Sequence, residues 1–90
     1  FLLFRAYPNP FNSRITFLVN SKNDFLGEIK IFDVAGKIVF MHKSLEIRSG
    51  ENHYYWNGID MKGMSSPSGL YFVVLNNGTQ IFNQKILMIK

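Results

Sequence analysis

The 90-residue chain contains no cysteine. This absence excludes disulfide bridges, thiolate metal ligands and cysteine nucleophiles together, and it leaves the redox compartment undetermined. Histidine is scarce as well, because only His42 and His53 are present, and they are not in metal-ligand spacing with each other or with a carboxylate pair. We therefore expect both histidines on the solvent side of strands, without a catalytic role.

The sequence also lacks a long apolar run. The longest, Leu70 to Leu75, has six residues, whereas a membrane-spanning helix needs about 20. Residues 1–4 are apolar, but no basic residue precedes them and they are too few for a signal-peptide core. Because the chain begins with Phe1 rather than Met, we interpret it as a piece of a longer protein and expect no transmembrane segment within it.

Charge of one sign is not concentrated anywhere in the chain. The net charge is +4, from ten basic and six acidic residues that are dispersed along the sequence. Surfaces that bind nucleic acid usually cluster their charge, so we expect no nucleic-acid partner. With 47% apolar and 16% aromatic residues, the chain is too hydrophobic to stay unfolded, and its length suits one domain with one modest core.

The sequence does contain the periodicity of β-strands. No segment repeats apolar residues at helical spacing over three turns, whereas Ile15, Phe17 and Val19 share one face at period two. The pattern predicts strands over residues 14–19, 27–32, 38–42, 53–56, 69–75 and 79–90. Six or seven short strands at this spacing predict an all-β antiparallel sandwich, and we expect Trp56 and Tyr71 in its core.

Turn residues separate these strands. Asp33 to Lys37 predicts a hairpin in which Gly36 takes a positive φ and Asp33 bonds to the turn amides. Asn76 to Gly78 predicts a second hairpin, of type I′, because Asn-Gly suits two successive positive φ angles. The apolar run from Gly69 to Leu75 predicts either burial on both faces or a central position in a sheet.

Groups that could carry chemistry are few. None of the serine or threonine hydroxyls lies in a Gly-x-Ser-x-Gly turn. The loop from Asn57 to Gly63 faintly resembles a calcium loop, but it offers a single carboxylate, Asp60, and Lys62 adds a positive charge. We therefore expect Asp60 and Asn57 to bond to loop amides, and we predict no metal, no cofactor and no enzymatic activity.

The aromatic residues could suggest a surface on which sugars stack. Strand alternation argues against it, because Tyr54 and Trp56 share one face while Tyr55 lies on the other. We expect only Tyr55, together with Phe25 or Phe40, to be exposed. One or two exposed aromatics make a weak sugar-binding surface.

The segment Tyr7-Pro8-Asn9-Pro10-Phe11-Asn12 has a distinct character. Each proline keeps its predecessor out of the helical region, so we expect a stiff, extended lead-in to the sandwich. Tyr7 and Phe11 are then predicted to pack as anchors on the sandwich edge.

Several segments follow one another in the order of a known family. They are Phe1-x-Leu3; Tyr7-Pro8-Asn9-Pro10-Phe11-Asn12; Ile29-x-Ile31-Phe32-Asp33-Val34-Ala35-Gly36-Lys37-x-Val39; Trp56-Asn57-Gly58-x-Asp60-x-x-Gly63; Pro67-Ser68-Gly69-Leu70-Tyr71-Phe72; and Lys85-Ile86-Leu87-Met88-Ile89-Lys90. In these segments the chain resembles the C-terminal sorting domain, type A, of the type IX (Por) secretion system. The resemblance extends over essentially all 90 residues.

The resemblance implies an immunoglobulin-like antiparallel sandwich of about seven short strands, forming one sorting domain over residues 1–90 with a lead-in at 1–12 and the sandwich at 13–90. It gives a structural role to these positions: Tyr7, Pro8, Asn9, Pro10, Phe11, Asn12, Asp33, Gly36, Trp56, Gly58, Asp60, Gly63, Gly69 and Tyr71. It assigns recognition to the final run: Lys85, Ile86, Leu87, Met88, Ile89 and Lys90. This run should form a strand at or near a sheet edge, with one face buried and its backbone edge or its end available to a receptor.

The same resemblance implies partners and a route. An exported cargo domain precedes the sorting domain, an outer-membrane translocon recognises it, and a sortase-like peptidase commonly removes it as the cargo is released or attached to a surface anchor. The cargo then passes through the periplasm to the cell surface or the medium.

Two other classes of function stay open. One is a carbohydrate-binding accessory module of a secreted enzyme, which several exposed aromatics on one face would favour. The other is a structural immunoglobulin-like domain similar to that of the flagellar hook-capping protein, which shares the Trp-x-Gly and Gly-Leu-Tyr-Phe segments. We favour sorting, because a structural module has no reason to lie at the end of its parent protein.

Overall fold

The computed structural model describes residues 2–90. These residues form seven strands and no helix. The strands are β1 (Leu2–Tyr7), β2 (Ile15–Ser21), β3 (Phe25–Asp33), β4 (Ile38–Ile47), β5 (Gly50–Trp56), β6 (Gly69–Asn76) and β7 (Ile81–Met88). No helix in residues 2–90 therefore has the length and apolar character needed to cross a membrane.

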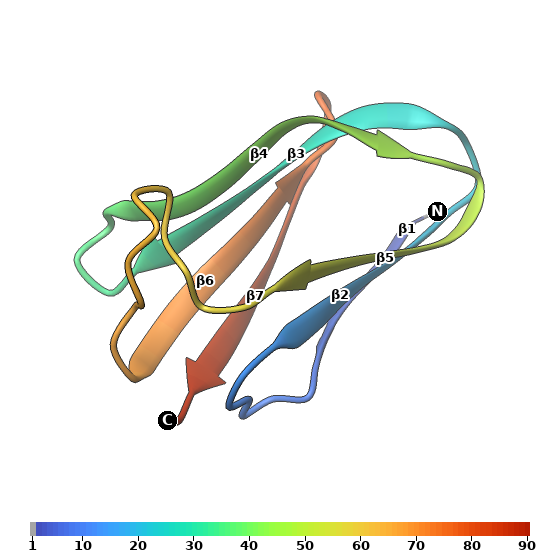
Figure 1. Ribbon diagram of the computed structural model, residues 1–90. Helices are drawn as coiled ribbons and strands as arrows, with labels where there is room; N and C mark the ends of the chain where they lie inside the picture. The colour runs from blue at the N-terminus through green and yellow to red at the C-terminus, as the bar shows by residue number, and fades with distance from the viewer. Residues whose placement is uncertain (1) are drawn as a thin grey trace.

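The strands pack as two antiparallel sheets face to face (Figure 1). One sheet has the order β1-β2-β5 and the other the order β4-β3-β6-β7. Seven-stranded immunoglobulin domains likewise place the first, second and fifth strands in one sheet and the third, sixth and seventh in the other. The fourth strand differs, because here β4 pairs with β3, whereas in those domains it belongs to the sheet of the first strand. The prediction of an all-β, immunoglobulin-like sandwich is confirmed.

The core lies between the two sheets and follows from period-two alternation. Ile15, Phe17 and Val19 all point inward from β2, as their spacing predicts. Trp56 and Tyr71, at 1% and 3% exposure, are both in the core. Their rings meet edge to face with centroids 5.4 Å apart, a favourable geometry for an aromatic pair.

Several strand boundaries differ from the prediction. Residues 2–7 form β1, which pairs with β2 along its whole length, so this part of the predicted lead-in belongs to the sandwich. β4 continues to Ile47 rather than ending at His42. Ser44, with φ of 54°, lies at the irregularity that divides β4, and sequence alternation alone does not mark it. β5 begins at Gly50, within the predicted turn.

The second hairpin forms at the predicted place but not as a two-residue type I′ turn. The connection runs over residues 77–80, and the Asn77 N–H donates to the Gln80 carbonyl. The Asn77 side chain accepts hydrogen bonds from the Thr79 and Gln80 amides and so stabilises a longer turn. β6 is central, between β3 and β7, but only one of its faces is buried.

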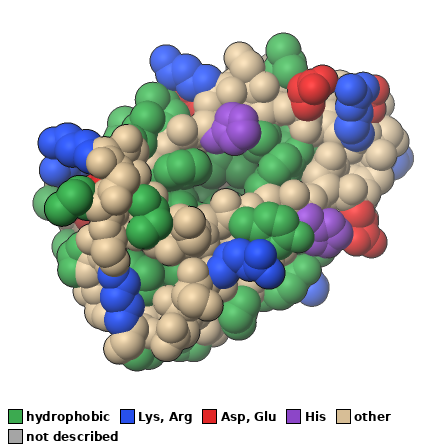
Figure 2. All heavy atoms as spheres, in the orientation of Figure 1, with side chains coloured by type: hydrophobic (Ala, Val, Ile, Leu, Met, Phe, Trp, Pro, Cys, Tyr) green, Lys and Arg blue, Asp and Glu red, His purple; other side chains and the backbone are tan. Residues whose placement is uncertain are grey.

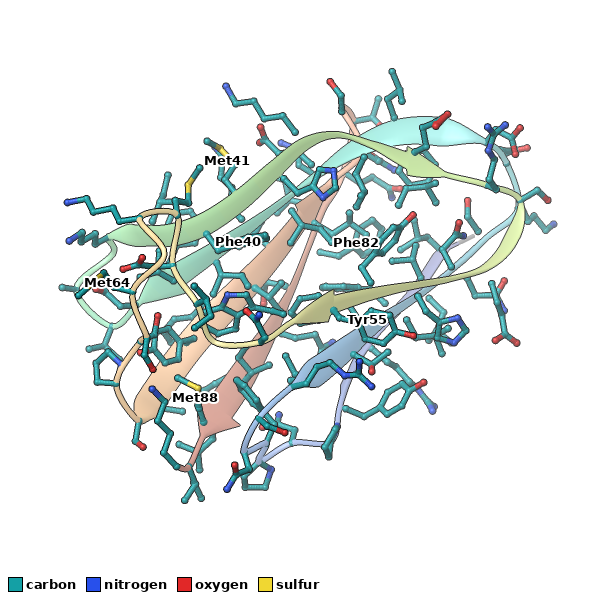
Figure 3. The ribbon with its side chains drawn as sticks, in the orientation of Figure 1. Phe40, Met41, Tyr55, Met64, Phe82 and Met88 are labelled. Atoms are coloured by element: carbon teal, nitrogen blue, oxygen red, sulfur yellow. The ribbon has the colours of Figure 1, made fainter. Side chains whose placement is uncertain are left out.

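β4 and β5 are outer strands of the two different sheets and do not pair with each other. Figure 3 shows Phe40 of β4 and Phe82 of β7, and both are only partly buried against the core. The hydroxyl of Tyr54 in β5 donates to the Glu46 carbonyl in β4 at 2.5 Å and so joins the two sheets.

His42 and His53 are both exposed, and His53 lies on the solvent side of its strand as predicted. His42 instead lies on the inner side of β4, because it pairs with the buried Ile29.

Candidate functional site

The predicted recognition run, Lys85 to Lys90, is divided between the core and the surface. β7 is the outer strand of its sheet, as expected. Ile86 and Met88 are fully buried, at 0% and 1% exposure, because they alternate onto the inner face. Lys85, Ile89 and Lys90 are exposed and Leu87 is half-buried. Two of the six side chains therefore belong to the core, and the other four are fully or partly available for contact.

A segment that we call the strap, residues 8–12, lies along the outer edge of β7. The Asn9 side chain donates from Nδ2 to the Lys85 carbonyl and accepts from the Leu87 N–H through Oδ1, both at 2.9 Å. The Phe11 N–H donates to the Leu87 carbonyl at 2.9 Å, and the Ile89 N–H donates to the Phe11 carbonyl at 2.8 Å. Figure 1 shows this loop, after β1, beside the end of β7.

The strap behaves as a short parallel strand. Phe11 bridges Met88 in the parallel sense. In a parallel ladder, a residue opposite Ile86 would donate its N–H to the Lys85 carbonyl and accept from the Leu87 N–H. The side-chain carboxamide of Asn9 makes these same two hydrogen bonds. The backbone edge of β7 from Lys85 to Ile89 is thus already paired. Of the two predicted alternatives, an available backbone edge or an available end, the first does not hold for this part of the strand.

Phe11 anchors the strap, and Tyr7 does not. The Phe11 ring is buried, with its centroid 6.0 Å from that of Trp56. Tyr7 remains 44% exposed, because it is an outward-facing residue of β1. The prediction of two anchors is correct for Phe11 and wrong for Tyr7.

The end of the run contacts the long loop between β5 and β6. The Lys90 N–H donates to the Ser68 hydroxyl at 3.0 Å, and the Lys90 ammonium group bonds to the Ser65 hydroxyl. Gly58 lies against Met88, and a Cβ at this position would approach the Met88 sulfur to 3.0 Å. The strap and this loop therefore hold the final run from two sides.

Asp60 and Asn57 shape that loop as predicted. Asp60 Oδ1 accepts from the amides of Lys62 and Met64, both at 2.9 Å, and Asn57 Oδ1 accepts from the Ile59 amide at 3.1 Å. Asp33 makes the equivalent pair of bonds, to the amides of residues 35 and 37. Within residues 2–90, no three histidine or acidic side chains converge in a way that could hold a metal ion.

Tyr71 forms a tyrosine corner, a feature that the sequence interpretation missed. Its hydroxyl donates to the Pro67 carbonyl, four residues earlier, at 2.5 Å. Immunoglobulin-like domains use this bond at the start of their sixth strand. Burial is the largest influence and raises the pKa of Tyr71; a hydrogen bond with Ser66 lowers it, and the charge of Asp33 raises it. The signal in the sequence was the tyrosine beside Pro67-Ser68-Gly69.

The outer face of the β1-β2-β5 sheet carries the exposed tyrosines. Tyr55 is 55% exposed, as predicted, and the Arg14 guanidinium lies 4.6 Å from its ring centroid. Tyr7 and Tyr55 both pair with Thr16, so they lie in one row across the sheet. Phe25 and Phe40 are only half-buried. On the face that Figure 2 shows, Lys and Arg side chains are scattered rather than gathered in one patch.

Comparisons with known proteins agree with this fold. Two solved structures from Porphyromonas gingivalis are similar. One is of PorZ, an essential surface component of the type IX secretion system, with 19% identity, a TM-score of 0.70, and 97% of this chain and 11% of that chain covered. The other is of dimeric latent PorU, with 19% identity, a TM-score of 0.71, and 98% and 9% covered. This chain therefore spans only a small part of each, and the likeness shows the fold alone.

The comparison with curated protein sequences finds no match. The family comparison does, and it matches residues 5–90 to the family described as the secretion system C-terminal sorting domain, the Por secretion tail. The match takes in the strap, both aspartate-shaped turns, the tyrosine corner and the final run. The resemblance seen in the sequence is confirmed, and the chain belongs to the secretion system C-terminal sorting domain family.

Proposed function

We propose that this domain is a non-catalytic sorting signal that directs an exported cargo protein through the type IX translocon of the outer membrane. The observation that carries the proposal is the family match over residues 5–90. The likeness to domains of PorZ and PorU, at the level of fold, is consistent with it. The partners are the translocon, a sortase-like peptidase and a cargo domain earlier in the same chain.

The geometry supports a signal that is read in the folded state. Exposed side chains of Lys85, Ile89 and Lys90 alternate with the buried Ile86 and Met88, so folding decides which side chains a receptor meets. An unfolded run would present all six residues without order. We infer that the receptor recognises Lys85 to Lys90 on the folded sandwich. The cargo then passes through the periplasm to the surface or the medium. There the domain is removed and replaced by a surface anchor.

One observation favours a second candidate, a carbohydrate-binding accessory module. Tyr7 and Tyr55 are both exposed and lie in one row of the same sheet face. Strand spacing places them about 10 Å apart, with Thr16 between them. Arg14 already stacks on Tyr55, so one of the two rings is partly engaged.

The test must spare the core, because deleting Lys85 to Lys90 would also remove the buried Ile86 and Met88. The informative variant therefore combines Lys85→Ser, Ile89→Ser and Lys90→Ser in the intact secreted protein. Cell fractionation should find folded, active cargo trapped in the periplasm. The control Tyr55→Ser should leave export intact, whereas a carbohydrate-binding module would lose its ligand. Normal surface appearance of the triple variant would contradict recognition of the run.

A further inference from the structure

The outward-facing side of the β4-β3-β6-β7 sheet carries an apolar patch. Sheet register aligns Leu87 of β7 with Leu70 of β6, and Phe72 of β6 with Phe32 of β3. Phe32 in turn pairs with Ile38 of β4. We call the side chains of these five residues the outer patch. It crosses all four strands without interruption.

The outer patch is unusually apolar for a solvated sheet face. Phe72, Ile38 and Leu70 are 38%, 39% and 40% exposed. Antiparallel sheets with one solvated side normally alternate apolar and polar residues, and the inner residues of β6 already supply the core. The apolar outer positions of β6 are therefore not required to build the core, although each is partly covered by its neighbours. Monomeric proteins commonly expose apolar patches of up to a few hundred Å², and such patches are often functional, so the outer patch is a candidate contact surface.

Toward the other end of the sheet the outward-facing positions are mixed, because Val74 of β6 pairs with Lys30 of β3 and the exposed Ile81 of β7 pairs with Asn76 of β6. There, the outward-facing positions of β3 are occupied by Glu28 and Lys30, which form an ion pair at 3.4 Å. A depression lined by Pro10, Leu70 and Leu87 extends the patch to the strap. The apolar surface thus adjoins the same strap and strand that form the candidate recognition site.

Lys85 gives the patch its charge. It is the register partner of Phe72 and is exposed. No acidic side chain of residues 2–90 lies within ion-pair distance of it. Burying a lysine without a partner is costly, so a protein that covers this patch must bring a carboxylate to it.

We propose that the outer patch docks an apolar protein surface of the secretion machinery that carries a carboxylate opposite Lys85. This inference rests on the proposed sorting function and names its contact surface. Leu87 and Lys85 are the outward-facing residues of the predicted recognition run on β7, so the run is read together with Leu70 and Phe72. On the same face of β3, a second copy would offer Lys85 the carboxylate of Glu28, which is already paired with Lys30.

The size of the patch suits a brief contact. Four strands at normal spacing span about 14 Å, so a patch of this depth covers roughly 200 Å². A stable interface usually buries about 800 Å² on each partner. Docking on the outer patch alone is therefore weak, as expected for a signal that must be released after transport.

The test uses the intact secreted protein and four single substitutions. Phe72→Asp places a charge in the middle of the patch, and Lys85→Glu reverses its charge. Lys85→Arg keeps the charge, and Tyr55→Asp is the matched control, an exposed aromatic on the other sheet. We expect Phe72→Asp and Lys85→Glu to reduce surface cargo by about tenfold or more, with Lys85→Arg and Tyr55→Asp close to wild type. Limited proteolysis checks folding, and because Lys85 is exposed, Lys85→Glu remains decisive if Phe72→Asp unfolds.

Three outcomes would overturn the proposal. In the first, Phe72→Asp and Lys85→Glu are both exported normally, while the protein that lacks residues 1–90 is retained in the periplasm. This result would refute the docking surface and leave the sorting function unchallenged. Normal export with loss of a dimer in sedimentation would show that the patch joins two copies. Normal export of the protein that lacks residues 1–90 would refute the sorting function and the docking surface together.

Discussion

The carboxamide of Asn9 accepts a hydrogen bond at 2.9 Å from the main-chain N–H of Leu87, which lies 78 residues later in the chain. The same carboxamide donates to the carbonyl of Lys85. One side chain thus joins the strap to the recognition run and covers the backbone edge of an outer strand. Uncovered edges pair readily with other strands, so the strap also protects the domain from edge-to-edge aggregation.

Asn9→Ala should reduce the free energy of unfolding by about 1–2 kcal/mol, because two hydrogen bonds are lost from a partly solvated edge. Urea denaturation measures it. Asn12→Ala, in the same strap and exposed, is the matched control and should be close to neutral. Equal unfolding midpoints for the two variants would show that the Asn9 bonds contribute nothing to stability.

Trp56→Ala should cost about 3–5 kcal/mol, because a buried aromatic is removed and its cavity collapses only in part. The indole also donates to the Ile59 carbonyl at 2.9 Å, so the loop after β5 should loosen as well. Chemical denaturation checks the stability, and proteolysis of the loop checks the second effect. A cost below 1 kcal/mol would contradict the central position of Trp56 in the core.

Gly58→Ala and Gly63→Ala form a matched pair. Both glycines have a positive φ, of 79° and 82°, so both substitutions should incur a backbone cost of about 1–2 kcal/mol. Only at Gly58 would the new Cβ meet an atom, the Met88 sulfur at 3.0 Å, whereas Gly63 faces open space. Gly58→Ala should therefore be the more destabilising in thermal unfolding. Equal losses of stability for the two variants would show that the contact between Gly58 and Met88 is not tight enough to affect folding.

Stability should fall at alkaline pH. Burial raises the pKa of Tyr71 above the ordinary tyrosine value of about 10, and burial and Glu46 raise that of Tyr54. The folded domain therefore keeps these protons at a pH where the unfolded chain has lost them. The stabilisation is fully present below about pH 10 and is lost as the pH rises through the folded values.

Tyr71→Phe separates the two contributions. It removes the titration of Tyr71 and leaves that of Tyr54, so its unfolding free energy should fall less steeply above pH 10 than that of the wild type. At neutral pH it should be less stable by about 1 kcal/mol, because the Pro67 carbonyl loses its donor. Urea titrations at neutral pH and above pH 10 check both effects. Identical alkaline slopes would show that Tyr71 does not contribute to the pH dependence.

Local pattern was sufficient to predict most of the fold. Alternation placed Ile15, Phe17, Val19 and Trp56 on inner faces, and turn chemistry identified the bonds of Asp33 and Asp60 to their loop amides. β1 was missed because its neighbouring Leu2, Leu3 and Phe4 hide the period of two. The four-residue turn after β6 was missed because a side chain, that of Asn77, decides its length.

The candidate site was predictable only in part. The family segments located the strap and the final run, but the predicted recognition run combined the buried Ile86 and Met88 with the exposed lysines, which alternation along β7 separates. The bonds of Asn9 to β7 depend on tertiary placement of residues far apart in the chain, which no local pattern encodes. The outer patch and the Tyr7–Tyr55 row likewise follow from sheet register.

Transfer of residues 1–90 to a passenger protein tests the sorting function most directly. A soluble periplasmic protein would carry the domain at its C-terminus in a strain with a working type IX system, and cell fractionation would locate it. Sorting by this domain predicts that the passenger reaches the surface or the medium, and that it stays in the periplasm when the system is inactivated or when the triple variant at residues 85, 89 and 90 is used. A passenger that stays in the periplasm although the attached domain is folded would contradict the sorting function.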